Sequence, residues 1–193
     1  MKRVKIVVAY DGTNYCGWQV QPNGLSVQEV LEKHLSDLLC EEIRITGASR
    51  TDAGVHARCY VANFRTTSTI PVERLPYALN THLPCDIVVT KAFEVNENFN
   101  AIGSCVRKEY TYQIYNSRLK DPFYVDRAWF YPRHLDEARM QAAAQQFVGR
   151  HDFLALCAAG SSAAAHGDTV RTITDCHVTR KGDEIDIEVT ADG

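Results

Sequence analysis

The chain has 193 residues, of which 45% are hydrophobic and 23% charged, and a formal net charge of −3. These values are typical of a globular protein with one large domain or two small ones, and they count against binding nucleic acid through bulk positive charge. No apolar run approaches the roughly 20 residues that span a bilayer. The apolar run "IVVAY" near the N-terminus is too short for a signal peptide, so we expect a cytoplasmic protein.

The seven cysteines do not indicate a disulfide framework or a metal site. They are scattered, odd in number and never arranged as C-x-x-C. His56 and Cys59 are three residues apart, but no second pair of ligands accompanies them. We expect reduced thiols, no metal and no cofactor.

The first half of the chain alternates strand-like and helix-like segments. The pattern predicts a strand at 4–10, a helix at 26–40, strands at 43–46 and 59–66, an irregular helix at 71–83 and a strand at 86–95. The order β-α-β-β-α-β is that of ferredoxin-like and RNA-recognition folds. We therefore expect an α+β domain at 1–104.

The second half begins in the same way. Its pattern predicts a strand at 108–116, a helix at 135–149 and a β-hairpin across the turn at 181–183. Compared with the first half, a helix and a strand are missing after this β-α-β-β order. We expect a second domain at 105–193 that is C-terminally incomplete and exposes apolar surface.

One loop carries the candidate chemistry. Residues 47–57, "GASRTDAGVHA", hold Arg50, Asp52 and His56 among glycines and alanines. Small residues around charges indicate that something approaches the backbone closely. On one interpretation Asp52 caps a turn through its side chain and Arg50 pairs with it. On the other, Asp52 is a nucleophile or base that Arg50 keeps ionised.

An ionised aspartate limits the possible chemistry. Its ordinary pKa is about 3.9, and a nearby guanidinium lowers that pKa further. Such a group does not act as an acid at neutral pH, but it can attack an electrophilic carbon or stabilise a cationic sugar. Glycosidases need a second carboxyl group to protonate the leaving oxygen, and none lies near this loop in sequence. A lone carboxylate suits a leaving group such as uracil, which departs without strong acid help.

Further motifs accompany this loop in a recognisable order. They are "YDGTNYCGWQVQ" (10–21), "ALNTHLPCDIVV" (78–89), "KEYTYQIYN" (108–116), "LDEARMQAAAQQFVGRHDF" (135–153) and "RTI" (171–173). With the loop, they resemble the tRNA pseudouridine synthase A family over essentially all 193 residues. The resemblance implies a pseudouridine synthase fold, with two ferredoxin-like halves around a mixed, largely antiparallel sheet. It also implies a homodimer that binds tRNA and needs neither a metal nor a cofactor.

The implied reaction is the isomerisation of uridine to pseudouridine at positions 38, 39 and 40 of the family's substrate, in the anticodon stem-loop of tRNA. By this resemblance Asp52 is the nucleophile at ribose C1′, and Arg50 helps to displace the base and pairs with the aspartate. Tyr110 lies against the flipped uracil, whereas a purely structural interpretation makes it a half-buried strand aromatic. His56 has no assigned chemistry and is expected to pack or to fix the loop.

The sequence departs from the family pattern at a few positions. Asn100 and Ile102 stand in "FNAI" where relatives often have "FHAR" or "FHPR", which removes a basic contact with RNA. Ser49 replaces a common glycine of the loop, a small change that we expect to be tolerated.

The resemblance also predicts a segment after Gly193, with a leucine at the uracil pocket and an arginine that pairs with Asp52. We therefore expect a shortened chain with little or no activity. The alternatives from other classes are a non-catalytic RNA-binding module, an inactive truncated synthase and, less well supported, a retaining glycosidase.

Overall fold

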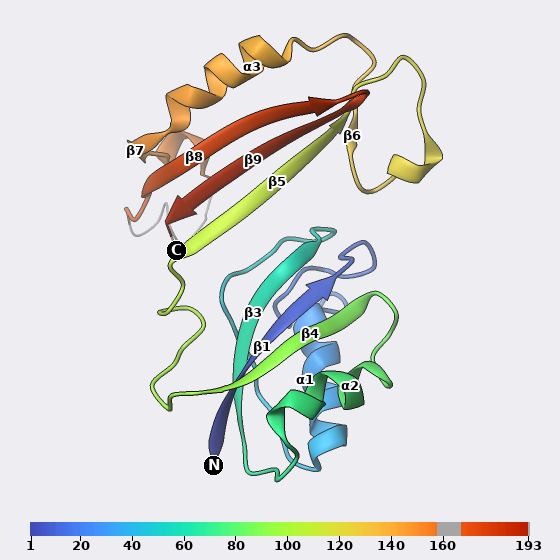
Figure 1. The fold of residues 1–193 in the computed structure, drawn as a ribbon, viewed down its shortest axis with the longest axis vertical. Helices are drawn as coiled ribbons and strands as arrows, with labels where there is room; N and C mark the ends of the chain where they lie inside the picture. Colours follow the sequence, from blue (N-terminus) through green and yellow to red (C-terminus); the bar gives the residue numbers. More distant parts are fainter. Residues whose placement is uncertain (158–166, 193) are drawn as a thin grey trace. The chain divides into compact units, whose positions relative to one another are not determined.

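A computed structural model of the chain describes residues 1–157 and 167–192. The chain divides into two compact units, unit 1 (Met1–Cys105) and unit 2 (Val106–Gly193). Each unit is described by itself, with its elements labelled as in Figure 1. None of the helices in the described part of the chain is long and apolar enough to cross a membrane.

Unit 1 is a four-stranded sheet with two α-helices. In chain order its elements are β1 (Lys2–Tyr10), α1 (Val27–Leu39), β2 (Thr46–Gly47), β3 (Ala57–Thr66), the 3-10 turn η1 (Val72–Arg74), α2 (Leu75–Asn80) and β4 (Ile87–Val95). The strands take the order β2-β3-β1-β4, and neighbouring strands are antiparallel. The predicted order β-α-β-β-α-β is confirmed for this unit.

The core of unit 1 lies between the sheet and its helices. On β1 the buried residues alternate, as the period of a strand requires, and they are Val4, Ile6, Val8 and Tyr10. The helix α1 contributes Leu31 and Leu35, which have no exposed surface, and α2 adds Leu75 and Leu79 to the same cluster. The apolar face of α1 therefore packs on the sheet.

The strand predicted at 43–46 is wrong for most of its length, and β2 is correspondingly short. The reason is that side chains of α1 bind the backbone of this segment. The N–H groups of Ile43 and Ile45 donate at 2.9 Å to Ser36 Oγ and Glu32 Oε1, respectively. Both isoleucine side chains are buried. The apolar alternation therefore predicted burial correctly but not strand pairing.

Unit 2 is a five-stranded mixed sheet with the helix α3 lying along β8 (Figure 1). Its strands and helix are β5 (Arg107–Tyr115), β6 (Trp129–Phe130), α3 (Glu137–Ala144), β7 (Gly149–Asp152), β8 (Val170–Lys181) and β9 (Glu184–Asp192). The order is β6-β5-β9-β8-β7, in which β6 is parallel to β5 and the other neighbours are antiparallel. The α+β class and the β8–β9 hairpin are confirmed.

The helix predicted at 135–149 is shorter in the structure. α3 ends at Ala144 and is followed by a 3-10 turn, Gln145–Phe147, and by β7. Gly149 has a φ of 114°, which is incompatible with a continuing right-handed helix and turns the chain into β7. The sequence of β7, "GRHD", has no strand-like alternation, so this strand was not predicted.

Unit 2 has a thin core. The buried apolar side chains among its described residues are Ile114, Ala144, Cys176 and Ile185. On β5, Tyr110 and Tyr112 are 51% and 56% exposed. Unit 2 therefore presents aromatic surface on β5.

Candidate active site

The loop between β2 and β3 presents Arg50 and Asp52 to solvent while it is bound to the core between them. The Thr51 hydroxyl forms a hydrogen bond with the Tyr10 hydroxyl at 2.9 Å, and the Thr51 carbonyl accepts from the Trp18 N–H at 3.1 Å. Tyr10 and Trp18 are both buried. The residue before Asp52 is thus fixed on two sides, and the Asp52 side chain remains accessible.

A tight turn follows Asp52. The Val55 N–H donates to the Asp52 carbonyl at 3.2 Å, and Gly54 takes a φ of 78°, a value that favours glycine. The Gly54 N–H in turn donates to the Tyr15 carbonyl at 3.3 Å. In the described parts of the chain the Asp52 carboxylate makes no hydrogen bond. The turn is therefore closed by the backbone of Asp52 and not by its side chain.

Two glycines of the segment after β1 let its backbone lie directly against the loop. A Cβ on Gly12 would lie 2.0 Å from the Val55 carbonyl oxygen, and a Cβ on Gly17 would lie 2.4 Å from that of Thr51. Real side chains do not tolerate such distances, so any other residue at either position would displace the loop. Backbone contact between segments about forty residues apart thus sets the shape of the site.

Gly47 at the start of the loop is small for a different reason. A Cβ there would lie 2.3 Å from Tyr60 Oη and 2.5 Å from Trp18 Nε1. The Trp18 and Tyr60 rings are stacked, with centroids 3.9 Å apart. The small size of Gly47 therefore serves packing within the protein. By contrast, a Cβ on Gly54 would meet nothing within 4 Å, so the turn after Asp52 is open to an approaching molecule.

His56 holds the C-terminal end of the loop through polar contacts of its ring. Its Nδ1 lies 3.1 Å from the Gly12 nitrogen and 3.0 Å from Asp11 Oδ1. The same Asp11 oxygen accepts from the Thr13 N–H at 3.1 Å and from the Thr13 hydroxyl at 2.6 Å. These contacts agree with the loop-fixing role expected of His56.

A second carboxylate, which the sequence did not single out, supports the segment after β1. The Tyr15 hydroxyl donates to Asp86 Oδ1 at 2.6 Å, and the Asp11 N–H donates to the Asp86 carbonyl at 2.9 Å. Burial, followed by the hydrogen bond and the charge of Asp86, raises the pKa of the Tyr15 phenol well above its ordinary value. Tyr15 therefore stays protonated and holds its place. Tyr15 lies within the motif "YDGTNYCGWQVQ" and Asp86 within "ALNTHLPCDIVV", but neither motif indicated their contact.

Two of the three predicted site residues belong to the loop of unit 1, and the third belongs to unit 2. Arg50 and Asp52 share the loop, but no ion pair joins them in the residues that the structure describes. Tyr110 lies on β5 of unit 2 and is 51% exposed, as a half-buried strand aromatic would be. The pairing of Arg50 with Asp52 and the role of Tyr110 stay predictions.

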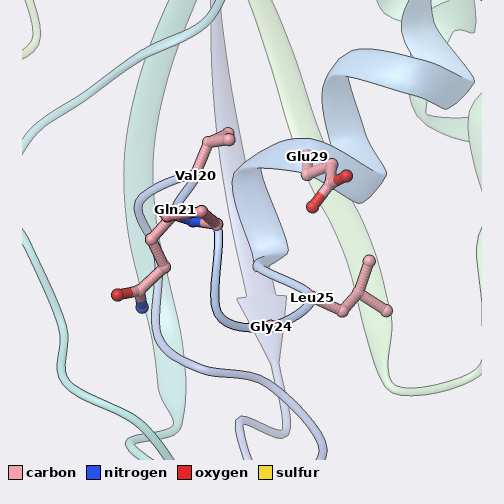
Figure 2. A pocket seen from close by; sticks show the side chains of 6 residues that line it. Val20, Gln21, Gly24, Leu25 and Glu29 are labelled. Carbon is pink, nitrogen blue, oxygen red and sulfur yellow. The ribbon is translucent and has the colours of Figure 1, made fainter.

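A shallow hollow of unit 1 is formed by the segment between β1 and α1 and by the first turn of α1, and Asp52 does not line it. It lies at the start of α1 (Figure 2) and is lined by Val20, Gln21, Pro22, Gly24, Leu25 and Glu29. The Gln21 amide donates to the Cys16 carbonyl at 2.5 Å and fixes one wall. Because neither Arg50 nor Asp52 lines this hollow, the candidate chemistry is on the open surface of the loop.

The departures at Asn100 and Ile102 have a local structural consequence. The Asn100 side-chain oxygen accepts from the Ile102 N–H at 2.9 Å and shapes a turn. Ile102 is 60% exposed. An apolar side chain thus faces solvent at this position.

Comparison with known proteins identifies the family of this chain. Residues 6–102 and 143–193 match the family model described as tRNA pseudouridine synthase. The tRNA pseudouridine synthase A of Thermoanaerobacter sp. (strain X514) is 47% identical over 195 residues, which cover the whole chain and 78% of that protein. Proteins of the same name from Acetivibrio thermocellus and Pelobacter propionicus are 44% and 42% identical over 193 residues, with the same coverage. The chain belongs to the tRNA pseudouridine synthase family, whose members are isomerases.

Proposed function

We propose that the protein isomerises uridine to pseudouridine in the anticodon stem-loop of tRNA, at family positions 38, 39 and 40, with Asp52 as the nucleophile. Membership of the family supports the reaction. One structural observation carries the assignment to Asp52. Its carboxylate is exposed and makes no hydrogen bond among the described residues, while Thr51 and Gly54 beside it are hydrogen-bonded to β1 and to the segment after β1. A nucleophile needs both an accessible atom and a fixed position.

The proposed reaction conserves every atom of the substrate. An Asp52 oxygen attacks ribose C1′, and the C1′–N1 bond breaks with its electron pair remaining on uracil. The uracil turns so that C5 faces C1′, the C5–C1′ bond forms, and the carboxylate leaves. The proton on C5 is then lost and N1 gains one. No oxidant, reductant or group donor is needed.

Arg50 and Tyr110 have supporting roles in this proposal. The stacked target base must leave the stem, at a cost on the order of a few kcal/mol. Arg50 is exposed next to Asp52 in the loop, where a guanidinium can take the place of the displaced base. Tyr110 offers an exposed ring on which the flipped uracil can stack, and aromatic stacking is the usual way in which proteins hold an unpaired base.

We also infer that the protein binds tRNA as a homodimer. The resemblance of the whole sequence to the family supports this inference. Two copies would double the number of phosphate contacts, which matters for a chain of net charge −3.

Carbodiimide labelling with primer extension tests the proposed function, because pseudouridine and uridine have the same mass. An unmodified tRNA transcript incubated with the protein should acquire stops at positions 38 to 40. A transcript with cytidine at these positions is the matched control and should acquire none. Binding of tRNA without any stop would contradict the proposal and favour one of the two inactive alternatives, a non-catalytic RNA-binding module or an inactive truncated synthase. Stops elsewhere would contradict the proposed positions.

A further inference from the structure

We propose that His56 is a positioning residue that sets the place of Asp52 through its Nδ1 atom, by clamping the end of the loop to Asp11 and Gly12. The inference rests on the proposed role of Asp52 as the nucleophile. It concerns how the protein holds that carboxylate in place, and it assigns His56 no contact with the substrate.

The loop is attached to the segment after β1 on both sides of Asp52. On the N-terminal side, Thr51 is bound through its hydroxyl and its carbonyl to the buried Tyr10 and Trp18. On the C-terminal side, the Gly54 N–H makes one hydrogen bond of 3.3 Å, which is at the long end of the range. His56 therefore provides the shorter attachment on that side, at 3.0 and 3.1 Å.

The position of Nδ1 makes this clamp independent of the ring's protonation state. A ring nitrogen cannot donate and accept at once. Without a proton, Nδ1 accepts from the Gly12 N–H, and with a proton it donates to Asp11 Oδ1. Both partners are in the same two-residue stretch, which the Asp86 carbonyl holds through the Asp11 N–H at 2.9 Å. The loop end is thus bound to one place in either state.

The close packing beside His56 shows how a loose clamp would move Asp52. Gly12 has room for no Cβ because the Val55 carbonyl lies against it. Val55 in turn donates its N–H to the Asp52 carbonyl at 3.2 Å. A shift of His56 away from Gly12 is therefore passed through Val55 to the backbone of Asp52. A misplacement of about 1 Å at a reacting group can cost about a hundredfold in rate.

Two variants of nearly equal polarity separate this proposal from direct catalysis by the ring. In His56→Asn the amide reaches the place of Nδ1 and can either accept from Gly12 or donate to Asp11. In His56→Gln the longer side chain brings its amide to the place of Nε2. We expect the glutamine variant to lose about tenfold to a hundredfold in kcat with the KM for tRNA nearly unchanged. The asparagine variant should recover most of the rate.

Amide hydrogen exchange gives a readout that needs no turnover. The Gly12 and Gly54 amides should exchange slowly in the wild type and in His56→Asn, and faster in His56→Gln. A wild-type protein that makes no pseudouridine would contradict the proposed function, whereas the exchange comparison would still test the clamp. Thermal melting of each variant checks that the fold is intact, and both variants should fold because the His56 side chain is 34% exposed.

Three results would overturn the proposal. If His56→Gln keeps its kcat while His56→Asn loses it, the ring acts through Nε2 and not through the clamp. Equal rates in the wild type and both variants would show that the clamp does not position Asp52. Equal exchange of the Gly12 amide in all three proteins would show that there is no clamp.

Discussion

Unit 1 and unit 2 are each built on one sheet, but they bury very different amounts of apolar surface. In unit 1 two helices pack on the sheet around a large cluster that includes Phe64, Leu31 and Leu35. In unit 2 only one described α-helix, α3, lies along the sheet, and Tyr110 and Tyr112 of β5 are exposed. The Asp52 loop belongs to the deeply packed unit. A reactive group can therefore be both accessible and fixed in position when the backbone beside it is hydrogen-bonded to a packed core.

The largest expected effect is the loss of a core side chain from unit 1. Phe64→Ala should lower the free energy of unfolding by about 3–5 kcal/mol, because the side chain is 2% exposed and its removal leaves a cavity. Denaturant unfolding followed by the fluorescence of the buried Trp18 measures it. Phe123→Ala, at a residue of unit 2 that is 86% exposed, is the control and should change stability by less than about 0.5 kcal/mol. Similar losses in both variants would remove the contrast between the units.

A smaller loss of stability is expected when the buried carboxylate that links α1 to the segment before β2 is removed. Glu32 is 7% exposed and accepts from the Gln28 amide and the Ile45 N–H, both at 2.9 Å. Glu32→Ala leaves the Ile45 N–H unpaired, while the Gln28 amide keeps the Ile45 carbonyl as an acceptor at 3.2 Å, and should cost about 1–3 kcal/mol. Glu42→Ala removes an exposed partner of Arg44 and should cost about 0–1 kcal/mol. A Glu32 variant as stable as the Glu42 variant would show that polar contacts add little to unit 1.

Amide hydrogen exchange compares the two units directly. The amides of β1 and β3 should be protected more strongly than those of β5 and β9, by about 1 kcal/mol or more of local opening free energy, since thinly packed regions open at lower cost. Exchange rates read residue by residue, by NMR, provide the measurement. Equal protection of the central strands of both sheets would show that the small core of unit 2 is as stable as that of unit 1.

The smallest effect concerns the pH dependence of unit 1. Hydrogen bonds, first from the Thr66 hydroxyl and then from the Thr67 N–H, lower the pKa of the Glu41 carboxyl below its ordinary value. A carboxyl group whose folded-state pKa is depressed stabilises the protein above its unfolded pKa, about 4.3 for glutamate, and this stabilisation is lost as pH falls through the folded value. Glu41→Gln should therefore lose less stability than the wild type on acidification below about pH 4.3. An NMR titration midpoint for Glu41 at or above that value would contradict the assignment.

Much of this architecture follows from the period of apolar residues, and the exceptions have physical causes. Alternation over 4–10 predicted β1 because one face of that strand packs on the helices. The same alternation failed at Ile43 and Ile45, whose N–H groups are bound by side chains of α1 and not by a strand. A pattern of burial cannot show which group satisfies a backbone donor.

The candidate site was found from sequence only in part. The loop around Asp52 was evident because an unusual set of charged and small residues lies within a few positions of the chain. Its supports, Tyr15 and Asp11, lie about forty residues earlier, within "YDGTNYCGWQVQ", and that motif does not indicate that they support the loop. Their contribution depends on backbone contact at Gly12 and Gly17, which a single sequence does not reveal.

The central claim is that Asp52 supplies the reacting carboxylate on a fixed loop, and one comparison of variants tests it most directly. Asp52→Asn removes the negative charge and leaves the backbone contacts of Thr51 and Gly54 in place, and Asp37→Asn makes the same change at an exposed position of α1. Pseudouridine formation in tRNA should fall below about a hundredth of the wild-type rate in Asp52→Asn, about 2.7 kcal/mol of barrier. It should be unchanged in Asp37→Asn, and both variants should keep the wild-type melting temperature and affinity for tRNA. An Asp52→Asn protein that keeps more than about a hundredth of the wild-type rate would contradict the claim.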